Sequence, residues 1–240
     1  MTIVAQVIKN KAVQSIFTIS PNATVLEAIT IMAEKGVGAL VVAEDENRIF
    51  FGVAKEYVDY AYESDTTILD EERVSLDIWG WQDAEIQPMQ LKNKSQAERK
   101  TYLAVMDLTN LQINQLATLE VDNVQLENKI TKDFALAYTD QPYRRSYSWD
   151  IQIGRDLYLV DFKTGAQKLI EKNASGFARL SPDGKYAYWY DGRDSSWVAY
   201  DLASKAKINL TKALPVPFYE ELHDSPSLPG SYGSEGWLAG

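Results

Sequence analysis

The chain has 240 residues, a formal net charge of −10 and no cysteine. An acidic chain is a poor polyanion binder, so neither nucleic acid nor an anionic membrane is expected as a partner. The absence of cysteine excludes disulfides, thiolate metal sites and a cysteine nucleophile. No apolar run approaches the roughly 18 residues that span a membrane, and no apolar run follows a basic start, so we expect a cytoplasmic location.

The first part of the chain predicts a small α/β unit. Residues 12–20 alternate weakly and predict an extended segment. Thr24 and Glu27 have the spacing of a capping box, and Gly36 is expected to end the helix in a left-handed conformation. Residues 38–43 then predict a short buried strand. The helix has one apolar face, made of Val25, Leu26, Ile29, Met32 and Ala33.

This order of residues is similar to a known family. Pro-x-Ala-Thr-Val-x-x-Ala, followed by Met-x-x-x-x-Val-Gly-Ala-Leu-Val-Val, resembles the first part of a CBS domain over about residues 1–47. CBS units work in pairs, and the resemblance implies an adenosine-nucleotide ligand and a regulatory role. The alternative is that the same positions are only core and turn residues. The positions that family geometry suggests for the nucleotide are Thr18, Ile19, Ser20, Gly38, Ala39 and Leu40.

Two departures from the family pattern weaken the expected nucleotide site. Ala54 stands where the family has a hydroxyl residue, in the stretch Gly52-Val53-Ala54-Lys55-Glu56-Tyr57-Val58-Asp59, and no carboxylate follows three positions later. A second repeat of the unit is also absent from the sequence. We therefore expect no cofactor, with an adenosine nucleotide as the one candidate.

The segment between residues 48 and 100 mixes strand and helix signals. Residues 48–54 predict a strong strand, and residues 74–81 alternate like a half-buried strand. Residues 65–73 are acidic and turn-like, but they lack the alternating oxygen ligands of a calcium loop, so no metal site is expected. Residues 91–100 favour a helix or a long polar loop. The basic stretch 92–100 is interpreted as a solvated face.

From residue 102 onward a repeated turn dominates. Asp107, Asp161 and Asp201 each follow an apolar or aromatic run, and each has an apolar residue nine positions later. An Asp in this place starts a turn, because its carboxylate accepts hydrogen bonds from backbone N–H groups two residues on. Further hairpins are expected at 133–138 and 185–189. Two hairpins per unit make a four-stranded blade, and the spacing fits propeller repeats.

We therefore expect a mainly β fold: an incomplete β-propeller of about four blades over residues 48–240, preceded by a small α/β CBS-like segment at 1–47. Stretches such as PYRRSYSWD, DLYLVDFKTG and LSPDGKYAYWYD resemble the N-terminal propeller of a bacterial S9 (prolyl oligopeptidase-type) serine peptidase. In that family the propeller gates and positions peptides, and a separate α/β-hydrolase domain carries the Ser-Asp-His triad.

The sequence offers no convincing catalytic residue. The closest match to a Gly-x-Ser-x-Gly elbow is centred on Ser234, where Tyr232 replaces the first Gly and no strand precedes it. The single histidine, His223, is interpreted as a loop residue with local hydrogen bonds. The site prediction is thus no catalytic and no metal residues. The aromatic residues Trp79, Trp81, Trp189, Tyr190 and Trp197 are interpreted as core rather than as a ligand platform.

The leading hypothesis is a chimeric or truncated product, a non-catalytic S9-type propeller fragment fused to a truncated CBS segment near Glu44–Arg48. One alternative is a CBS-type regulatory protein that senses adenosine nucleotides. Another is the propeller subunit of a split peptidase. The partners expected are a peptide or a hydrolase domain, or a second copy that joins through the CBS-like segment or through open propeller edges.

Overall fold

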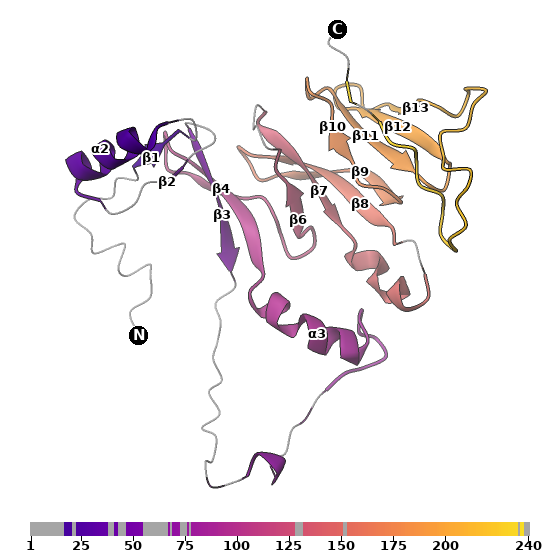
Figure 1. Cartoon of the computed structure of the whole chain (residues 1–240), viewed down its shortest axis with the longest axis horizontal. Helices are drawn as coiled ribbons and strands as arrows, with labels where there is room; N and C mark the ends of the chain where they lie inside the picture. The colour runs from indigo at the N-terminus through magenta and orange to yellow at the C-terminus, as the bar shows by residue number, and fades with distance from the viewer. Residues whose placement is uncertain are drawn as a thin grey trace. The chain divides into compact units, whose positions relative to one another are not determined.

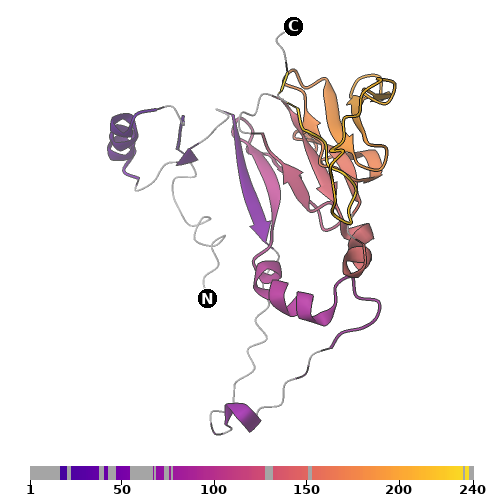
Figure 2. The same ribbon diagram turned by 45° about the vertical axis from the view of Figure 1, so that its right-hand side comes forward.

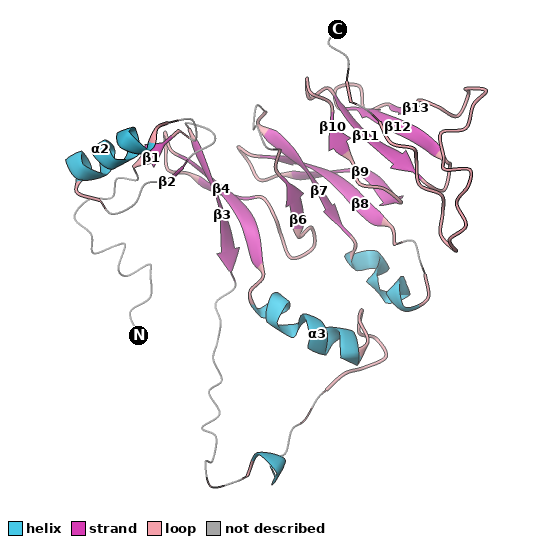
Figure 3. Cartoon of the chain, viewed as in Figure 1, coloured by secondary structure: helices cyan, strands magenta, loops and turns pink. Residues whose placement is uncertain are grey.

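A computed structural model of the chain is mainly β, with three antiparallel sheets and few helices (Figures 1 and 3). This architecture confirms the predicted fold class. The chain divides into two compact units, of which the first holds Met1–Phe50, Val105–Ile113 and Glu127–Thr131 and the second holds the remainder. The structure describes residues 17–20, 23–37, 41–42, 47–54, 67, 69–72, 76, 78–127, 132–150, 153–234 and 236–237.

The first unit contains the predicted helix. Strand β1 (Thr18–Ile19) pairs in parallel with β2 (Val41–Val42), and helix α2 (Val25–Lys35) lies between them in the chain. The capping box is confirmed: the backbone N–H of Thr24 donates to Oε2 of Glu27 at 2.7 Å, and that of Glu27 donates to Oγ1 of Thr24 at 3.3 Å. Gly36 ends the helix at φ 63°, the left-handed conformation expected there.

A three-stranded sheet has the order β3-β4-β5. Its strands are β3 (Arg48–Ala54), β4 (Thr101–Asp107) and β5 (Ile113–Gln115). Gly52 is required where β3 meets β4, because a Cβ there would lie 2.5 Å from Oγ1 of Thr101.

The connection from β3 to β4 is partly helical. It contains η1 (Asp70–Glu72) and α3 (Gln87–Glu98), and Pro88 lies in the first turn of α3, where a missing N–H costs nothing. The predicted strand at 74–81 is wrong over its described residues, 76 and 78–81, which form no strand. Leu76 and Ile78 are exposed, because the described residues of this segment pair with no strand. No helix in the described part of the chain is long and apolar enough to cross a membrane.

Two four-stranded antiparallel meanders follow, with the orders β6-β7-β8-β9 and β10-β11-β12-β13 (Figure 2). In each sheet every strand pairs with its neighbour in sequence, which is the topology of a propeller blade. The first contains β6 (Asn123–Gln125), β7 (Phe134–Thr139), β8 (Arg155–Asp161) and β9 (Gln167–Ala174), with η2 (Gln141–Ser148) between β7 and β8. The second contains β10 (Arg179–Leu180), β11 (Tyr186–Asp191), β12 (Ser196–Asp201) and β13 (Lys207–Asn209).

The repeated Asp turns have the predicted geometry. Oδ1 of Asp107 accepts a hydrogen bond from the N–H of Thr109 at 2.7 Å. The Asp161 and Asp201 carboxylates each accept two backbone N–H groups at 2.8 to 2.9 Å. In each turn the residue four positions after the Asp is left-handed: Leu111, Gly165 and Lys205, with φ of 58°, 71° and 62°. The three turns therefore share the same local structure.

The main core lies between the two meanders. It joins β7, β8 and β9 of one sheet to β11 and β12 of the other, and Trp189 is its largest member, 1 % exposed. Trp189 lies opposite Val198, and both point to this inner side. The buried members are Leu136, Leu157, Ala174, Ala178, Ala187, Trp189 and Val198. The number of about four blades stays a prediction, since three antiparallel sheets are formed by the residues described.

Candidate functional site

The strongest candidate site is a polar pocket of about 660 Å³ between α3 and η2, which we call the sheet-end pocket. One wall comes from the last turns of α3 and from Lys100. The other comes from the start of β6, the end of β7 and η2. The local sequence accounts for this position: α3 leads directly into β4, and η2 joins β7 to β8, so both helices stand beside strand ends. Loops and short helices at strand ends commonly carry binding sites.

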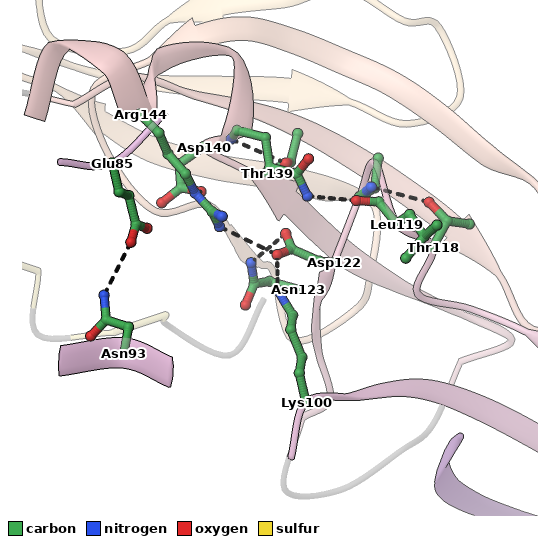
Figure 4. A network of polar contacts seen from close by, with 12 residues as sticks. Glu85, Asn93, Lys100, Thr118, Leu119, Asp122, Asn123, Thr139, Asp140 and Arg144 are labelled. Atoms are coloured by element: carbon green, nitrogen blue, oxygen red, sulfur yellow. Dashed lines mark hydrogen bonds and ion pairs between the residues drawn. The ribbon is translucent and has the colours of Figure 1, made fainter. Parts of the chain in front are cut away.

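A charged network lines this pocket (Figure 4). Arg144 bridges two carboxylates: its Nε donates to Oδ1 of Asp140 at 2.8 Å, and Nη2 donates to Oδ2 of Asp122 at 3.3 Å. Nζ of Lys100 pairs with the same oxygen of Asp122. Asn123 donates from Nδ2 to the other Asp122 oxygen at 2.8 Å. A fully buried carboxylate is therefore held by two cations and an amide, as a buried charge requires.

The network shifts the pKa values of its members. Burial acts to raise the pKa of Asp140, but the hydroxyl of Tyr147 and the guanidinium of Arg144 outweigh it, so the pKa lies below its ordinary value. The pKa of Arg144 is raised, since Asp140 and Asp122 outweigh the effect of its own burial. Burial and the hydrogen bond to Asp140, 2.6 Å long, raise the pKa of Tyr147 to about 12. At neutral pH Arg144 and Asp140 are charged and Tyr147 is neutral.

A second polar group lies on the other side of η2. The hydroxyl of Tyr143 donates to Oδ1 of Asp156 at 2.5 Å, and burial together with this bond raises the pKa of Tyr143 to about 12. The Arg155 guanidinium stacks on Phe177 with its carbon 3.5 Å from the ring centroid. Its buried Nε has no hydrogen-bond partner, and burial lowers the pKa of Arg155. The hydrogen bond between Tyr143 and Asp156 ties η2, which carries Arg144, to β8.

The residues that were predicted from the CBS resemblance are only partly described. Thr18 and Ile19 form β1, and Ser20 follows it. Gly38, Ala39 and Leu40 lie outside the described residues. Whether these six positions hold a nucleotide stays a prediction.

His223 makes local hydrogen bonds, as the sequence indicated. Its Nε2 lies 2.9 Å from Oγ of Ser227, and its Nδ1 lies 3.8 Å from Oε2 of Glu220. The second separation is longer than a hydrogen bond, so no carboxylate orients the ring as a triad requires.

Ser234 lines a different pocket of about 430 Å³. No cluster of three His, Asp or Glu side chains that could hold a metal ion occurs in the described part.

The aromatic residues divide into three groups. Trp189 is core, as expected. Tyr190 and Trp197 lie on the opposite face of their sheet, paired edge to face at 5.7 Å beside the 430 Å³ pocket. The core interpretation is wrong for Trp79 and Trp81, which are exposed, because their segment pairs with no strand. The Arg145 guanidinium lies over the ring of Trp81, with the carbon 5.6 Å from the centroid.

The residues of the sheet-end pocket were not found by sequence reasoning. Lys100 was assigned to a solvated face, yet it pairs with buried Asp122, 22 residues away. Two features of the sequence indicate part of this site. Asp140 and Arg144 have the i, i+4 spacing of a helical ion pair. Pro142, two residues after Asp140, indicates that a helix starts there. Neither signal indicates that Asp122 lies nearby.

Comparisons with known proteins give one family match. The family model of the CBS domain matches residues 6–54, about a fifth of the chain. The match runs through β3 to Ala54, past the boundary expected near residue 47. No curated protein matches the chain.

Among solved structures, the crystal structure of TolB from Acinetobacter baumannii is similar to this chain. The identity is 18 %, the TM-score is 0.31, and the alignment covers 47 % of this chain and 27 % of that one. The chain thus spans about a quarter of TolB, and a likeness at this TM-score does not establish a shared fold.

Proposed function

We propose that this chain is a non-catalytic module that binds peptides and positions them, joined to a CBS segment. The sheets would act as the propellers of S9-type serine peptidases do. The observation that supports this function is the sheet-end pocket, a charged recess of about 660 Å³ at the end of blade-like meanders. Its volume lies within the range of roughly 300–1,000 Å³ that is typical of ligand sites.

The lining chemistry suits a peptide. Amide side chains of Asn93, Gln96 and Asn123 can exchange hydrogen bonds with peptide groups, and Lys100 and Arg144 supply charge. His223 is paired with Ser227, and no carboxylate of the described residues lies at hydrogen-bond distance from its ring. A module that holds a peptide without cleaving it fits this arrangement.

The test combines binding and turnover measurements on the intact chain. An equimolar mixture of tripeptides is examined by saturation-transfer NMR, and a chromogenic dipeptide ester is used to detect hydrolysis. We expect saturable binding that is weakened in Arg144→Gln, with circular dichroism as the check on folding, and no turnover. Turnover that disappears in Ser227→Ala or in Ser234→Ala would contradict a non-catalytic role.

The CBS match favours a second candidate function, nucleotide sensing by the first unit. On this proposal β1, with Thr18 and Ile19, forms part of a site for an adenosine nucleotide, completed by a second copy or a partner. Isothermal titration with AMP, ATP and S-adenosylmethionine tests it. Absence of heat from a folded sample at millimolar ligand rules this function out.

A further inference from the structure

We propose that the sheet-end pocket binds a carboxylate, and that its ligand is the carboxyl end of a peptide. The inference rests on the proposed function and adds to it which end of the peptide is recognised. It follows from the difference in burial between the acidic and basic groups of the pocket.

The acidic side chains of the pocket are more deeply buried than the basic ones. The side chain of Asp122 is 0 % exposed and that of Asp140 is 19 % exposed. By contrast the side chains of Lys100 and Arg144 are 35 % and 26 % exposed. Arg99 also lines the pocket and is exposed. The charge accessible to a ligand is therefore positive, although the whole chain carries a net charge of −10.

Donors remain available on all three cations. Arg144 uses Nε and Nη2 for its two carboxylates, and a guanidinium has five N–H donors. Lys100 spends one of its three donors on Asp122. The side chain of Arg99 has no hydrogen bond or ion pair within the described part of the chain. An incoming carboxylate could thus be bound by Arg99 without displacing an existing pair.

The position of these cations at the C-terminal end of α3 has a simpler explanation as well. Arg99 is the C-cap of α3 and Lys100 follows it, where positive charge interacts favourably with the helix dipole. That effect needs no ligand. Arg144 on η2 faces the same recess from another element, where Asp140 and Asp122 hold it. Because both carboxylates are already paired with Arg144 and Lys100, the positive charge of Arg99 is left to meet an incoming anion.

A carboxylate and a phosphate share the chemistry that guanidinium groups recognise. We infer the carboxylate because the uncharged lining, apart from Ala97, consists of amide and hydroxyl side chains: Asn93, Ser95, Gln96, Asn123 and Tyr138. Such groups satisfy the N–H and C=O groups that precede a peptide terminus. Inorganic phosphate is therefore included in the test as the competing source of negative charge.

The experiment uses the intact chain and isothermal titration at low salt. The probes are trialanine, trialanine amide and inorganic phosphate, and the variants are Arg99→Gln and the control Lys92→Gln. Lys92 is exposed on α3 and lines no part of the pocket, so both substitutions remove one charge from the same helix. Neither is expected to disturb folding, since neither side chain has a hydrogen bond or ion pair with another residue that the structure describes.

We expect trialanine to bind at least about tenfold more tightly than its amide, because a charge-assisted hydrogen bond is lost in the amide. Arg99→Gln should weaken trialanine by a similar factor and leave the amide unchanged, and Lys92→Gln should change neither. Equal binding of acid and amide overturns the carboxylate inference but leaves peptide binding intact. Failure of both peptides overturns the proposed function as well, and binding of phosphate alone identifies an anion site of another kind.

Discussion

Helix α2 and the two meanders form under different constraints. None of the described residues of α2 is buried, and its Val25 is 76 % exposed although it belongs to the predicted apolar face. The meanders instead enclose a shared core around Trp189. The helix is therefore specified by local signals, namely the capping box and Gly36, whereas the sheets are specified by burial between strands far apart in sequence. Within one chain, α2 therefore forms without burying any of its described side chains, whereas the meanders form around a buried core.

The largest expected effect tests this contrast directly. Trp189→Ala should lower the free energy of unfolding by about 3–5 kcal/mol, because a buried aromatic ring is replaced by a cavity. Val25→Ala should change it by less than about 0.5 kcal/mol. Urea denaturation followed by far-ultraviolet circular dichroism measures both. Similar losses for the two variants would show that α2 contributes to a core after all.

A second comparison sets a buried ion pair against an exposed one. Asp122→Ala leaves Lys100 and Arg144 without their shared carboxylate and should cost about 1–3 kcal/mol, less than a fully buried pair because both cations are partly solvated. Asp194→Ala breaks only the exposed pair with Lys212, so we expect a change below about 1 kcal/mol. Thermal unfolding in low and in high salt distinguishes them. A larger loss for Asp194→Ala would contradict the importance of burial at the sheet-end pocket.

The Asp turns provide a local test within the core-dominated region. Gly165→Ala should destabilise by about 1–3 kcal/mol, since φ is 71° and the new Cβ would lie 2.5 Å from the carbonyl oxygen of Gln115. At the equivalent position Lys205→Gly should stabilise by up to about 1 kcal/mol, because a left-handed lysine is relieved. Denaturant midpoints measure the two changes. Shifts of the same sign would contradict the equivalence of the turns.

The smallest expected effect is a pH dependence at Asp183. The hydroxyl of Ser181, then the N–H and ammonium of Lys185, lower the pKa of Asp183 from 3.8 to about 2. A lowered folded-state pKa gives stability that is present above pH 3.8 and is lost as the pH falls toward 2. Asp183→Asn should therefore flatten the stability profile over this acidic interval and leave its shape near pH 7 unchanged. An identical acid limb in wild type and variant would exclude this contribution.

Sequence reasoning succeeded where a few neighbouring residues decide the structure. The capping box of Thr24 and Glu27 depends on residues three apart, and the turns at Asp107, Asp161 and Asp201 depend on backbone groups two or three residues on. The hairpin predicted at 185–189 is also confirmed by β11, because its partner strand follows within a few residues.

Prediction from the sequence failed where residues distant in the chain determine the structure. Residues 74–81 alternate like a strand, but no strand lies beside their described residues, so Ile78 and Trp79 remain exposed. The sheet-end pocket needs Lys100, Asp122 and Arg144 to meet, and each is separated from the next by 22 residues. No local sequence pattern predicts that these three side chains lie close together. Their proximity depends on the positions of α3 and η2 at the strand ends.

The distribution of tryptophan has an optical consequence. All six tryptophans lie among the described residues: Trp189 is enclosed in the core, whereas Trp81 is 79 % exposed beneath the Arg145 guanidinium, one residue from Arg144. Emission should therefore contain a blue component shielded from acrylamide and a red component open to it. Occupation of the sheet-end pocket would alter the red component alone, and loss of the core would move the blue one. On the proposed function, intrinsic tryptophan emission would therefore report folding through Trp189 and binding through Trp81.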